Sequence, residues 1–507
     1  MYSFLCLSLW SAAGLVALVV INIIRQLLPR KGTEPPVVFH WVPFVGSAVT
    51  YGIDPHKFLV SCREKHGDVF TFIMFGRKMT CCLGLKGNEF ILNGRHADLN
   101  AEEIYNPLTR PVFGPDIVYD CPNSKLMEQK RFMKYGLTHQ AHEIHVPLIE
   151  KEVLQYVSSA PSFKGERGTV DISSSMAEVT IFTAGRALQG KEVREKLSNE
   201  MASLYHDMDM GFKPINFLLP WAPLPHNFRR DKARAKMEAI YRKIIDERRR
   251  LGREKVDDAT DMIANLMGCK YKNGNPVPDS EIVNIMITLL MGGQHSSSSA
   301  SSWILLRLAS QPEVCEELYQ EQMKVLAKDG QLPPLRYADL DRLPLLQGTI
   351  KETLRCHSSI TSIMRKVSNP LPIPGTPYIV TTDKVLLSSP VITAMSEEFF
   401  PNASTWDPHR WLDRADDDEE IVDYGYGATS KGTKSPYLPF GAGRHRCIGE
   451  KFAYLNLGAI VTTIVRNFKL STLDGSRTVP DTDYNSLFSG PKKPAFIRWE
   501  RRKTATA

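Results

Sequence analysis

Much of this chain carries apolar residues at the spacing of amphipathic helices, above all between residues 124 and 370. In these stretches apolar positions recur every three or four residues, with charged residues between them. The pattern is clearest in four segments, residues 124–135, 146–158, 229–251 and 279–310. A further apolar run, residues 450–465, follows a glycine-rich segment near the C-terminus. These segments predict a body built mainly from helices.

Shorter segments have the composition of strands. Two β-rich runs, residues 68–75 and 78–85, flank Gly76 and Arg77 and predict a hairpin. Residues 366–401 are strand-like and rich in proline, whereas residues 413–433 are acidic and then glycine-rich, which predicts a surface loop. The sequence contains no internal repeat. We therefore expect a mainly α fold with small β-sheets.

The N-terminal segment is the least polar part of the chain. Residues 5–24 are nearly all apolar and carry no charge, and about 20 such residues suffice to span a bilayer as a helix. The basic residues that follow, Arg25, Arg30 and Lys31, place the next segment in the cytosol. A cleavable signal peptide is the alternative, because Ser11-Ala12-Ala13 resembles a cleavage site. No basic segment precedes the run, which continues past that site, so we favour an uncleaved anchor.

Composition narrows the class of protein. The 507 residues are 43% hydrophobic and 23% charged, which is the balance of a globular chain with a large core. The net charge of +7 is modest for this length and indicates no nucleic-acid partner. The nine cysteines form neither a disulfide framework nor a paired CxxC metal motif, and their odd number suits a reducing compartment.

One cysteine stands in a distinctive loop. Cys447 lies in the glycine-rich residues 440–449, directly after three cations and before the apolar run at residues 450–465. A metal ligand has to be the thiolate, which cations and a helix N-terminus favour. Gly441 and Gly443 let the backbone approach a flat ligand closely. The alternative is a buried structural cysteine in a glycine-rich turn.

The spacing Phe-Gly-x-Gly-x-His-x-Cys-x-Gly in this loop resembles the haem-thiolate loop of the cytochrome P-450 monooxygenases. The resemblance implies haem b with Cys447 as the axial iron ligand. It also implies O₂ and NADPH as co-substrates, with electrons delivered by an NADPH-cytochrome P-450 reductase. Cofactor contacts are expected from the remaining motif residues, Phe440, Gly441, Gly443, His445 and Gly449.

A second constellation lies upstream of this loop. Glu352 and Arg355 are three residues apart, on one face of a predicted helix, where they can pair. On a solvated helix such a pair contributes little. In the resembled family a Glu-x-x-Arg pair joins a later arginine in a buried triad that braces the haem loop. The resemblance implies that Arg410 is this third, structural member.

The middle of the helix predicted at residues 279–310 is unusual. It contains Gly292 and Gly293 followed by Gln294, His295 and a run of serines, all poor helix formers or residues that bend helices. One interpretation is a tolerated weak point packed against a neighbour. The other is a groove for dioxygen, with Gly292 and Gly293 beside the cofactor. Histidine at the usual acid position resembles the sterol 14α-demethylases. By resemblance, His295 and Ser296 deliver protons, and Ser296 replaces the usual threonine.

Residues 105–120 distinguish one family within this superfamily. Their pattern, Tyr-x-x-Leu-Thr-x-Pro-x-Phe-Gly-x-x-x-Val-Tyr-Asp, matches the substrate-roof motif of the sterol 14α-demethylases. The resemblance implies that the haem propionates contact Tyr105, Tyr119, Lys130 and Arg365 together with His445; Lys130 and Arg365 alone would otherwise be ordinary solvated cations. The sterol is expected to contact Tyr105, Leu108, Thr109, Phe113, Val118, Tyr119, Phe212, Leu289, Ile360, Ser362 and Leu487; several of these could be only core residues.

The resemblance runs from about residue 35 to about residue 500 and is greatest to filamentous-fungal forms. His96 departs from it, because relatives usually carry an apolar residue there. The implied division is a membrane anchor at 1–28, a proline-rich hinge at 29–50 and a haem-thiolate monooxygenase domain at 51–507. The implied location is the endoplasmic reticulum membrane, with the catalytic domain in the cytosol.

The resemblance implies a sterol 14α-demethylase that removes the 14α-methyl group of lanosterol or eburicol as formate, in ergosterol biosynthesis, and is a target of azoles. Two alternatives stay open. One is a haem-thiolate paralogue with another sterol or lipid substrate. The other is a haem protein that binds sterol without turnover.

Overall fold

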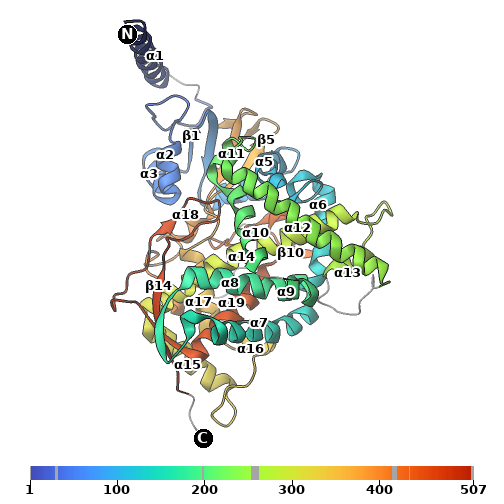
Figure 1. Ribbon diagram of the computed structural model, residues 1–507. Coiled ribbons are helices and arrows are strands. Elements are labelled where there is room, and N and C mark those ends of the chain that lie inside the picture. The colour runs from blue at the N-terminus through green and yellow to red at the C-terminus, as the bar shows by residue number, and fades with distance from the viewer. Residues whose placement is uncertain are drawn as a thin grey trace. The chain divides into compact units, whose positions relative to one another are not determined.

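The computed structural model describes residues 2–28, 32–196, 199–252, 262–413, 420–432 and 434–503. The chain divides into two compact units. Unit 1 contains Met1–Ile104, Thr361–Pro401 and Lys431–His445, and unit 2 contains Tyr105–Ile360, Asn402–Ser430 and Arg446–Ala507. Figure 1 shows the elements of both units. The expected mainly α fold with small sheets is confirmed.

Unit 1 is built around a five-stranded sheet with the order β1-β2-β8-β5-β3. The strands are β1 (Val69–Met74), β2 (Arg77–Cys82), β8 (Lys384–Ser388), β5 (Ile363–Val367) and β3 (Leu99–Asn100). Strands β2 and β8 are parallel, and the other neighbours are antiparallel. The predicted hairpin is confirmed, because Val69 pairs with Cys82 and Met74 with Arg77.

Helices and two short strands complete unit 1. They are α1 (Tyr2–Leu27), α2 (Ala48–Ile53), α3 (Pro55–His66), α4 (Gly84–Leu92), α18 (Pro390–Ala394), the 3-10 turn η7 (Gly443–His445), β6 (Leu371–Pro372) and β7 (Ile379–Val380). The segment predicted as a hinge hydrogen-bonds to β1, through Val38 N to Thr71 O at 2.8 Å and Ser47 N to Ile73 O at 2.8 Å. In the part of the chain that the structure describes, no helix combines the length and apolar character that a membrane crossing requires.

Unit 2 contains the long helices. They are α5 (Glu102–Phe113, which begins in unit 1), α6 (Asn123–Met133), α7 (His139–Ser159), α8 (Ile172–Ala184), α9 (Lys191–Lys196), α10 (Asn199–Asp209), α11 (Pro214–Leu218), α12 (Pro225–Arg250), α13 (Met262–Gly268), α14 (Asp279–Ser310), α15 (Pro312–Leu326), α16 (Tyr337–Leu340), α17 (Pro344–Cys356) and α19 (Glu450–Asn467). All five apolar segments predicted as helices are confirmed, although α6 ends two residues and α12 one residue before the predicted segments do. Helix α7 begins seven residues before the predicted segment 146–158, because the Thr138 hydroxyl accepts a hydrogen bond from Ala141 N at 3.3 Å and caps it.

Helix α14 is the central helix of unit 2. It packs against α8, α12, α17 and α19 (Figure 1). Its C-terminal half is almost completely buried, with Trp303 among the largest fully buried side chains. Helix α19, which follows Cys447, packs against α7, α14 and α17. The cysteine is therefore attached to a helix that neighbouring helices hold in place.

The strands of unit 2 are short. They are β4 (Arg167–Asp171), β11 (Phe468–Ser471) and β14 (Phe496–Arg501) in one sheet, with the pairs β9 (Ile421–Asp423) and β10 (Ala428–Ser430), and β12 (Thr482–Asp483) and β13 (Gly490–Pro491). The prediction of a surface loop at residues 413–433 is wrong for its second half, and residues 414–419 and 433 lie outside the described residues. Strands β9 and β10 form a hairpin there, because the Asp423 carboxylate accepts from Gly425 N and Gly427 N. Tyr426 between them is buried against Cys121, Leu126 and Met127.

Candidate active site

Cys447 lies in unit 2, three residues before α19 begins. Among the cysteines whose side chains the structure describes, Cys447 alone is exposed, and the others are buried or half-buried. The thiol is thus accessible to a ligand, and the alternative of a buried structural cysteine is wrong. Arg446, the neighbouring cation, is paired with Glu450 in the first turn of α19, with Nε and Oε2 2.8 Å apart.

The surroundings of this thiol have opposing effects on its pKa. Although the side chain is accessible, the protein atoms around it displace water, and this desolvation raises the pKa of Cys447. The backbone N–H of Gly449 and the charges of Lys130 and Arg446 act in the opposite direction. The cations and the start of the helix therefore favour the thiolate as expected, but desolvation outweighs them in the protein alone. A bound metal cation would itself favour the thiolate.

Two residues predicted to contact the cofactor lie close together in unit 2, within residues 105–120 (the roof segment). The rings of Tyr105 and Tyr119 lie 5.1 Å apart between centroids. Tyr105 is buried in α5, which makes the first half of residues 105–120 helical although it contains Pro107 and Pro111. The acidic residues in the first turn of α5 match the helix dipole and stabilise this start.

Lys130 is not an ordinary solvated cation. It is buried in α6, and its Nζ donates to the Arg446 carbonyl at 3.2 Å, one residue before the candidate ligand. The same Nζ lies 4.6 Å from the centroid of the Tyr426 ring, a cation–π contact. This places a positive charge beside the cysteine of unit 2.

Unit 1 carries the first half of the cysteine loop. Gly441 and Gly443 have φ values of +69° and +66°. A Cβ on Gly443 would stand 2.5 Å from Leu92 O, so only glycine fits where the loop meets the end of α4. Leu92, Leu438 and Ala442 form an apolar cluster at this contact. The loop therefore has one rigid, closely packed side.

His445 and Arg365 are also in unit 1. His445 Nε2 lies 3.8 Å from Glu102 Oε1. Arg365 is buried in β5, where its Nη1 donates to the Met364 carbonyl at 2.8 Å. A buried arginine on a strand is not the solvated cation of the alternative interpretation.

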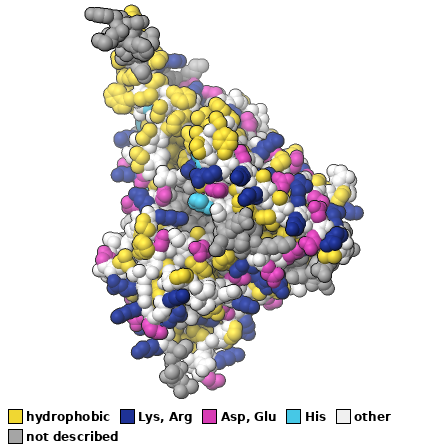
Figure 2. All heavy atoms as spheres, viewed as in Figure 1, with side chains coloured by type: hydrophobic (Ala, Val, Ile, Leu, Met, Phe, Trp, Pro, Cys, Tyr) yellow, Lys and Arg dark blue, Asp and Glu magenta, His cyan; other side chains and the backbone are white. Residues whose placement is uncertain are grey.

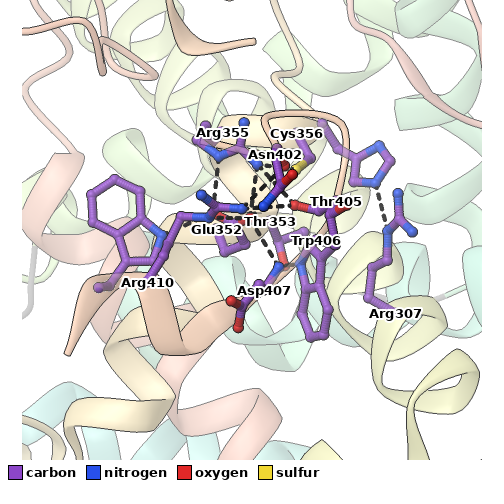
Figure 3. Close-up of polar contacts among 12 residues, drawn as sticks. Arg307, Glu352, Thr353, Arg355, Cys356, Asn402, Thr405, Trp406, Asp407 and Arg410 are labelled. Carbon is purple, nitrogen blue, oxygen red and sulfur yellow. Dashed lines mark hydrogen bonds and ion pairs between the residues drawn. The ribbon is translucent and has the colours of Figure 1, made fainter. Parts of the chain in front are cut away.

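The triad predicted from the Glu-x-x-Arg pair is present in unit 2 (Figure 3). Glu352 is fully buried and accepts from Arg355 Nε at 2.9 Å and Nη2 at 2.8 Å. Arg410 Nε reaches the same carboxylate at 3.0 Å. The interpretation as a solvated helix pair is therefore wrong, because all three charges are enclosed by the protein.

Further donors complete this network. Asp407 N and Trp411 Nε1 donate to Glu352 at 3.0 and 2.9 Å, and both arginines donate to the Thr405 carbonyl. Gly348 permits this approach, because a Cβ there would meet Pro408 O at 2.6 Å. The network ties α17 to the segment around η6 (Pro408–Trp411) and gives that segment a fixed position.

The two glycines of α14 have different surroundings. A Cβ on Gly293 would lie 2.8 Å from Leu188 Cδ1, so this glycine allows a close helix contact. A Cβ on Gly292 would meet nothing within 4 Å. The packing interpretation thus fits Gly293, whereas Gly292 faces open space, as a groove requires. The Ser296 hydroxyl donates to the Gly292 carbonyl at 3.1 Å, beside this space.

His295 is surrounded by aromatic rings and one carboxylate. Its Nε2 lies 2.5 Å from Asp209 Oδ1, at the end of α10. Its ring stacks on Phe488 with 5.1 Å between centroids and an interplanar angle of 11°. Tyr205 and Phe212 lie within 5.6 and 6.4 Å of it, between ring centroids. The imidazole is therefore packed between aromatic rings, with the Asp209 carboxylate close to its Nε2.

One predicted substrate residue, Phe212, contacts this histidine in unit 2, and others contact Phe212 or lie elsewhere in the same unit. Phe212 contacts Phe113 and Phe488, at 5.6 and 5.3 Å between centroids, and Leu487 N donates to Phe212 O. Leu108 and Thr109 are buried in α5, Leu289 is half-buried in α14, and Val118 has a φ of +53° in η1 (Val118–Asp120).

Two predicted substrate residues have other surroundings. Ile360 is 43% exposed at the end of its segment in unit 2. Ser362, in unit 1, is buried and accepts a hydrogen bond from Tyr51 at 2.9 Å. From the sequence alone, Ile360 and Ser362 could not be distinguished from the residues that pack around Phe212.

Three partners were missed from the sequence, Asp209, Trp411 and Glu102. Each is an ordinary residue in its own segment and acquires a role only through a distant partner. No local pattern marks Asp209 or Glu102. Trp411 follows Arg410 directly, so the proximity to the triad was a usable signal.

The residues fit haem. In unit 2, the accessible thiol and the open face at Gly292 suit a planar iron-containing group, and buried or half-buried Lys130, Tyr105 and Tyr119 suit its carboxylates. In unit 1, the glycine-lined loop would allow close approach of such a group, and Arg365 and His445 are side chains that suit carboxylates.

Comparison with known proteins agrees with this site. The family model for Cytochrome P450 matches residues 35–499. The chain is 65% identical to "Sterol 14-alpha demethylase CYP51A" of Gibberella zeae, over 99% of this chain and 100% of the relative. It is 63% identical to "Sterol 14-alpha demethylase cyp51A" of Aspergillus fumigatus, over 100% of both chains. It is 58% identical to "Eburicol 14-alpha-demethylase" of Penicillium italicum, over 96% and 95%.

A solved structure shares the fold. The retinoic acid-bound cyanobacterial CYP120A1 matches 93% of this chain and 100% of its own with a TM-score of 0.77, at 19% identity. The fold, the cysteine loop and the extent of the sequence identity lead to one conclusion. The chain belongs to the cytochrome P450 family and, within it, to the sterol 14-alpha demethylases.

Proposed function

We propose that this enzyme removes the 14α-methyl group of lanosterol or eburicol in three successive oxidations that consume O₂ and NADPH. The methyl group becomes an alcohol and then an aldehyde, and it leaves as formate with formation of a 14,15 double bond. The observation that carries the proposal is the accessible Cys447 in a chain that is 65% identical to a sterol 14-alpha demethylase over its full length.

We assign the cofactor contacts as follows. Haem b supplies the oxygen chemistry when it is bound, with Cys447 as the iron ligand. Gly441, Gly443 and Gly449 allow close approach of the loop, and Phe440 flanks it. The carboxylates of the cofactor would contact Tyr105, Tyr119, Lys130, Arg365 and His445. Burial of Lys130 and Arg365 supports this assignment, because a buried cation requires a counter-charge.

We assign proton delivery to His295 and Ser296. His295 Nε2 faces the Asp209 carboxylate, a group with which it could exchange a proton. The Ser296 hydroxyl is directed to the Gly292 carbonyl, beside the open face of α14. The two groups would relay protons from Asp209 to the groove.

Apolar side chains suit the substrate, an uncharged sterol with one hydroxyl. The cluster of Phe113, Phe212 and Leu487 would form one wall, with Leu108, Val118 and Leu289 nearby. Thr109 is less suited, because its hydroxyl already donates to the Tyr105 carbonyl at 3.0 Å. We therefore propose Thr109 as a support of the roof helix.

We further propose a single N-terminal membrane anchor at residues 1–28 and a location on the endoplasmic reticulum, where a reductase would supply electrons. Support comes from the apolar composition of residues 5–24 and from the continuous helix α1. Phe39, Trp41 and Phe44 are exposed after it, and Figure 2 shows hydrophobic side chains below the N-terminal helix. Aromatic residues are enriched at membrane interfaces.

Reconstituted turnover tests the function. The full-length holoenzyme, a reductase and NADPH are incubated with lanosterol, eburicol and a sterol without a 14α-methyl group. Formate and 14-demethylated sterol are expected from the first two only. Haem with a normal carbonyl spectrum but product from another lipid would support the paralogue alternative. A substrate-induced spectral shift without any product would support a binding protein.

A further inference from the structure

The roof segment turns after α5 through two residues with an unfavourable backbone conformation. Asp116 and Val118 have φ values of +67° and +53°. A positive φ is uncommon for a residue with a side chain, and for a β-branched residue such as valine it is an outlier that the surrounding structure has to hold. Val118 is a proposed sterol contact. Its position therefore depends on a turn, residues 115–118 (the roof turn), that the backbone alone does not favour.

The side chain of Gln129 bridges the roof turn. Gln129 belongs to α6 and is 1% exposed. Its Nε2 donates to the Asp116 carbonyl at 2.9 Å, and its Oε1 accepts from Val118 N at 3.3 Å. One amide thus meets both residues of positive φ. Its orientation is determined by these partners, because a backbone carbonyl only accepts and a backbone N–H only donates.

Buried polar groups hold Gln129 in turn. The same Nε2 donates to the Tyr271 hydroxyl at 3.2 Å and to Glu281 Oε2 at 3.4 Å. The Tyr271 hydroxyl donates to this carboxylate, and Lys125 Nζ donates to its other oxygen at 2.8 Å. The amide of Gln129 is therefore part of a connected network between α6 and the start of α14.

The start of the roof turn has a separate support. Asn284 in α14 is buried, and its Nδ2 donates to the Pro115 carbonyl at 3.0 Å. Arg234 Nη2 of α12 donates to Asn284 Oδ1 at 2.6 Å. Loss of the Gln129 amide would thus release the residues after Pro115, while Pro115 itself stays attached to α14. The effect of a substitution at Gln129 should be local to the turn.

We propose that Gln129 is a positioning residue that holds the roof turn in its positive-φ conformation and so determines where Val118 meets the sterol. The proposal rests on the proposed function, since it takes Val118 as a sterol contact. Without Gln129 the turn would populate conformations with negative φ. Sterol would bind only to the fraction of molecules with the native turn, and the apparent affinity would fall in proportion to that fraction.

The experiment compares the full-length wild-type holoenzyme with Gln129→Leu in two measurements. Amide hydrogen exchange without sterol reports on the turn, because Val118 N–H is bonded to Gln129. Optical titration with lanosterol and with eburicol gives a spectral dissociation constant for each. Gln129→Leu is expected to speed exchange within residues 114–120 and to weaken binding of both sterols roughly ten-fold, because two hydrogen bonds to the turn are lost.

A second substitution separates positioning from general stability. Asp116 is exposed, and glycine adopts a positive φ without steric cost. In the Gln129→Leu background, Asp116→Gly should recover most of the sterol affinity, because the native turn becomes easier to form. The exchange of Val118 N–H should stay fast, since its acceptor is still absent. In the wild-type background Asp116→Gly should change the affinity little, because Gln129 already holds the turn.

Gln322→Leu is the matched control. Gln322 in α15 is 2% exposed, and its Oε1 accepts from Arg466 Nε at 2.8 Å. The control loses a buried amide as Gln129→Leu does, but it should leave sterol binding and exchange within residues 114–120 unchanged. If Gln129→Leu yields no folded holoenzyme, Gln129→Asn takes its place, because its amide is one methylene shorter and cannot meet both residues of the turn.

Three results would overturn the proposal. The first is wild-type sterol affinity in Gln129→Leu, or in Gln129→Asn if that variant is used. The second is a loss of affinity that Asp116→Gly does not restore, which indicates a purely structural role. The third is an equal loss in Gln322→Leu.

The proposed function fails in a different way. A wild-type enzyme that binds sterol without product would refute that function alone, because neither measurement involves turnover. A wild-type enzyme that binds neither sterol would refute the proposed substrate. The role of Gln129 would then be decided by exchange within residues 114–120, where wild-type rates in Gln129→Leu would overturn it and faster rates would support it.

Discussion

Replacement of Glu352 by glutamine is the sharpest test of the buried network, because it keeps the shape of the side chain and removes its charge. In the native protein Oε1 accepts three N–H groups, from Arg355, Arg410 and Asp407, and Oε2 accepts two, from Arg355 and Trp411. A glutamine amide offers one acceptor oxygen. Whichever way it points, its NH₂ group faces at least two buried donors.

The magnitude follows from these contacts. Each buried donor left unsatisfied costs about 1–3 kcal/mol, and breaking a buried ion pair on one side costs about 3–5 kcal/mol. We take ~3–5 kcal/mol, because the two estimates describe the same loss. With an unfolding entropy of about 2.1 cal/mol/K per residue over 507 residues, this lowers the melting temperature by about 3–5 °C for a single cooperative transition.

The assay is differential scanning calorimetry of the holoenzyme, with haem content measured on the same sample. Glu195→Gln is the control, because its contact with Lys191 is exposed and 3.7 Å long, and such pairs contribute about 0–1 kcal/mol. A Glu352→Gln protein that melted within about 1 °C of the wild type and kept its full haem content would refute the reasoning. It would show that the two arginines do not need this counter-charge.

Three further substitutions test other features. Cys447→Ser is expected to abolish the thiolate-shifted band of the ferrous carbonyl complex, and persistence of that band would exclude Cys447 as the ligand. Gly443→Ala should lower haem retention, because its Cβ would meet Leu92 O at 2.5 Å. Gly475→Ala controls for backbone strain, because Gly475 also has a positive φ but a Cβ there would meet nothing within 4 Å. Equal effects of the two substitutions would contradict the packing argument. Burial lowers the pKa of His142 to about 4, so the unfolded chain binds more protons than the native one between about pH 6.5 and 4. Stability is therefore lost as the pH falls through that window, and His142→Phe should reduce the difference between melting temperatures at pH 7.5 and 5; an unchanged difference would show that His142 does not contribute.

The helices were predictable because their signal is local. An apolar residue every three or four positions determines which face of a segment is buried, whatever it packs against. This held for α14, whose predicted and observed ends coincide despite two glycines and a serine run. It failed at Tyr426, since composition indicated a polar loop and the ring is buried against residues far away in the chain.

The chemistry of single residues was predictable only where a motif spans a few positions. The cysteine loop and the Glu-x-x-Arg pair were identified in this way. The pKa of Cys447 was not, because desolvation depends on atoms from several segments and outweighs the neighbouring cations. The different surroundings of Gly292 and Gly293 also followed from packing, because Leu188 approaches Gly293 and nothing lies within 4 Å of a Cβ on Gly292.

By itself the sequence determined the helical class, the hairpin of β1 and β2, the cysteine motif and the family resemblance, because each depends on residues that are close in the chain. Only the tertiary structure decided which carboxylate meets which basic side chain. Asp209 reaches His295, Glu102 lies between His96 and His445, and Glu352 gathers donors from α17 and η6. Such pairings depend on where whole elements pack, and packing is set by the summed burial of many side chains rather than by any local pattern.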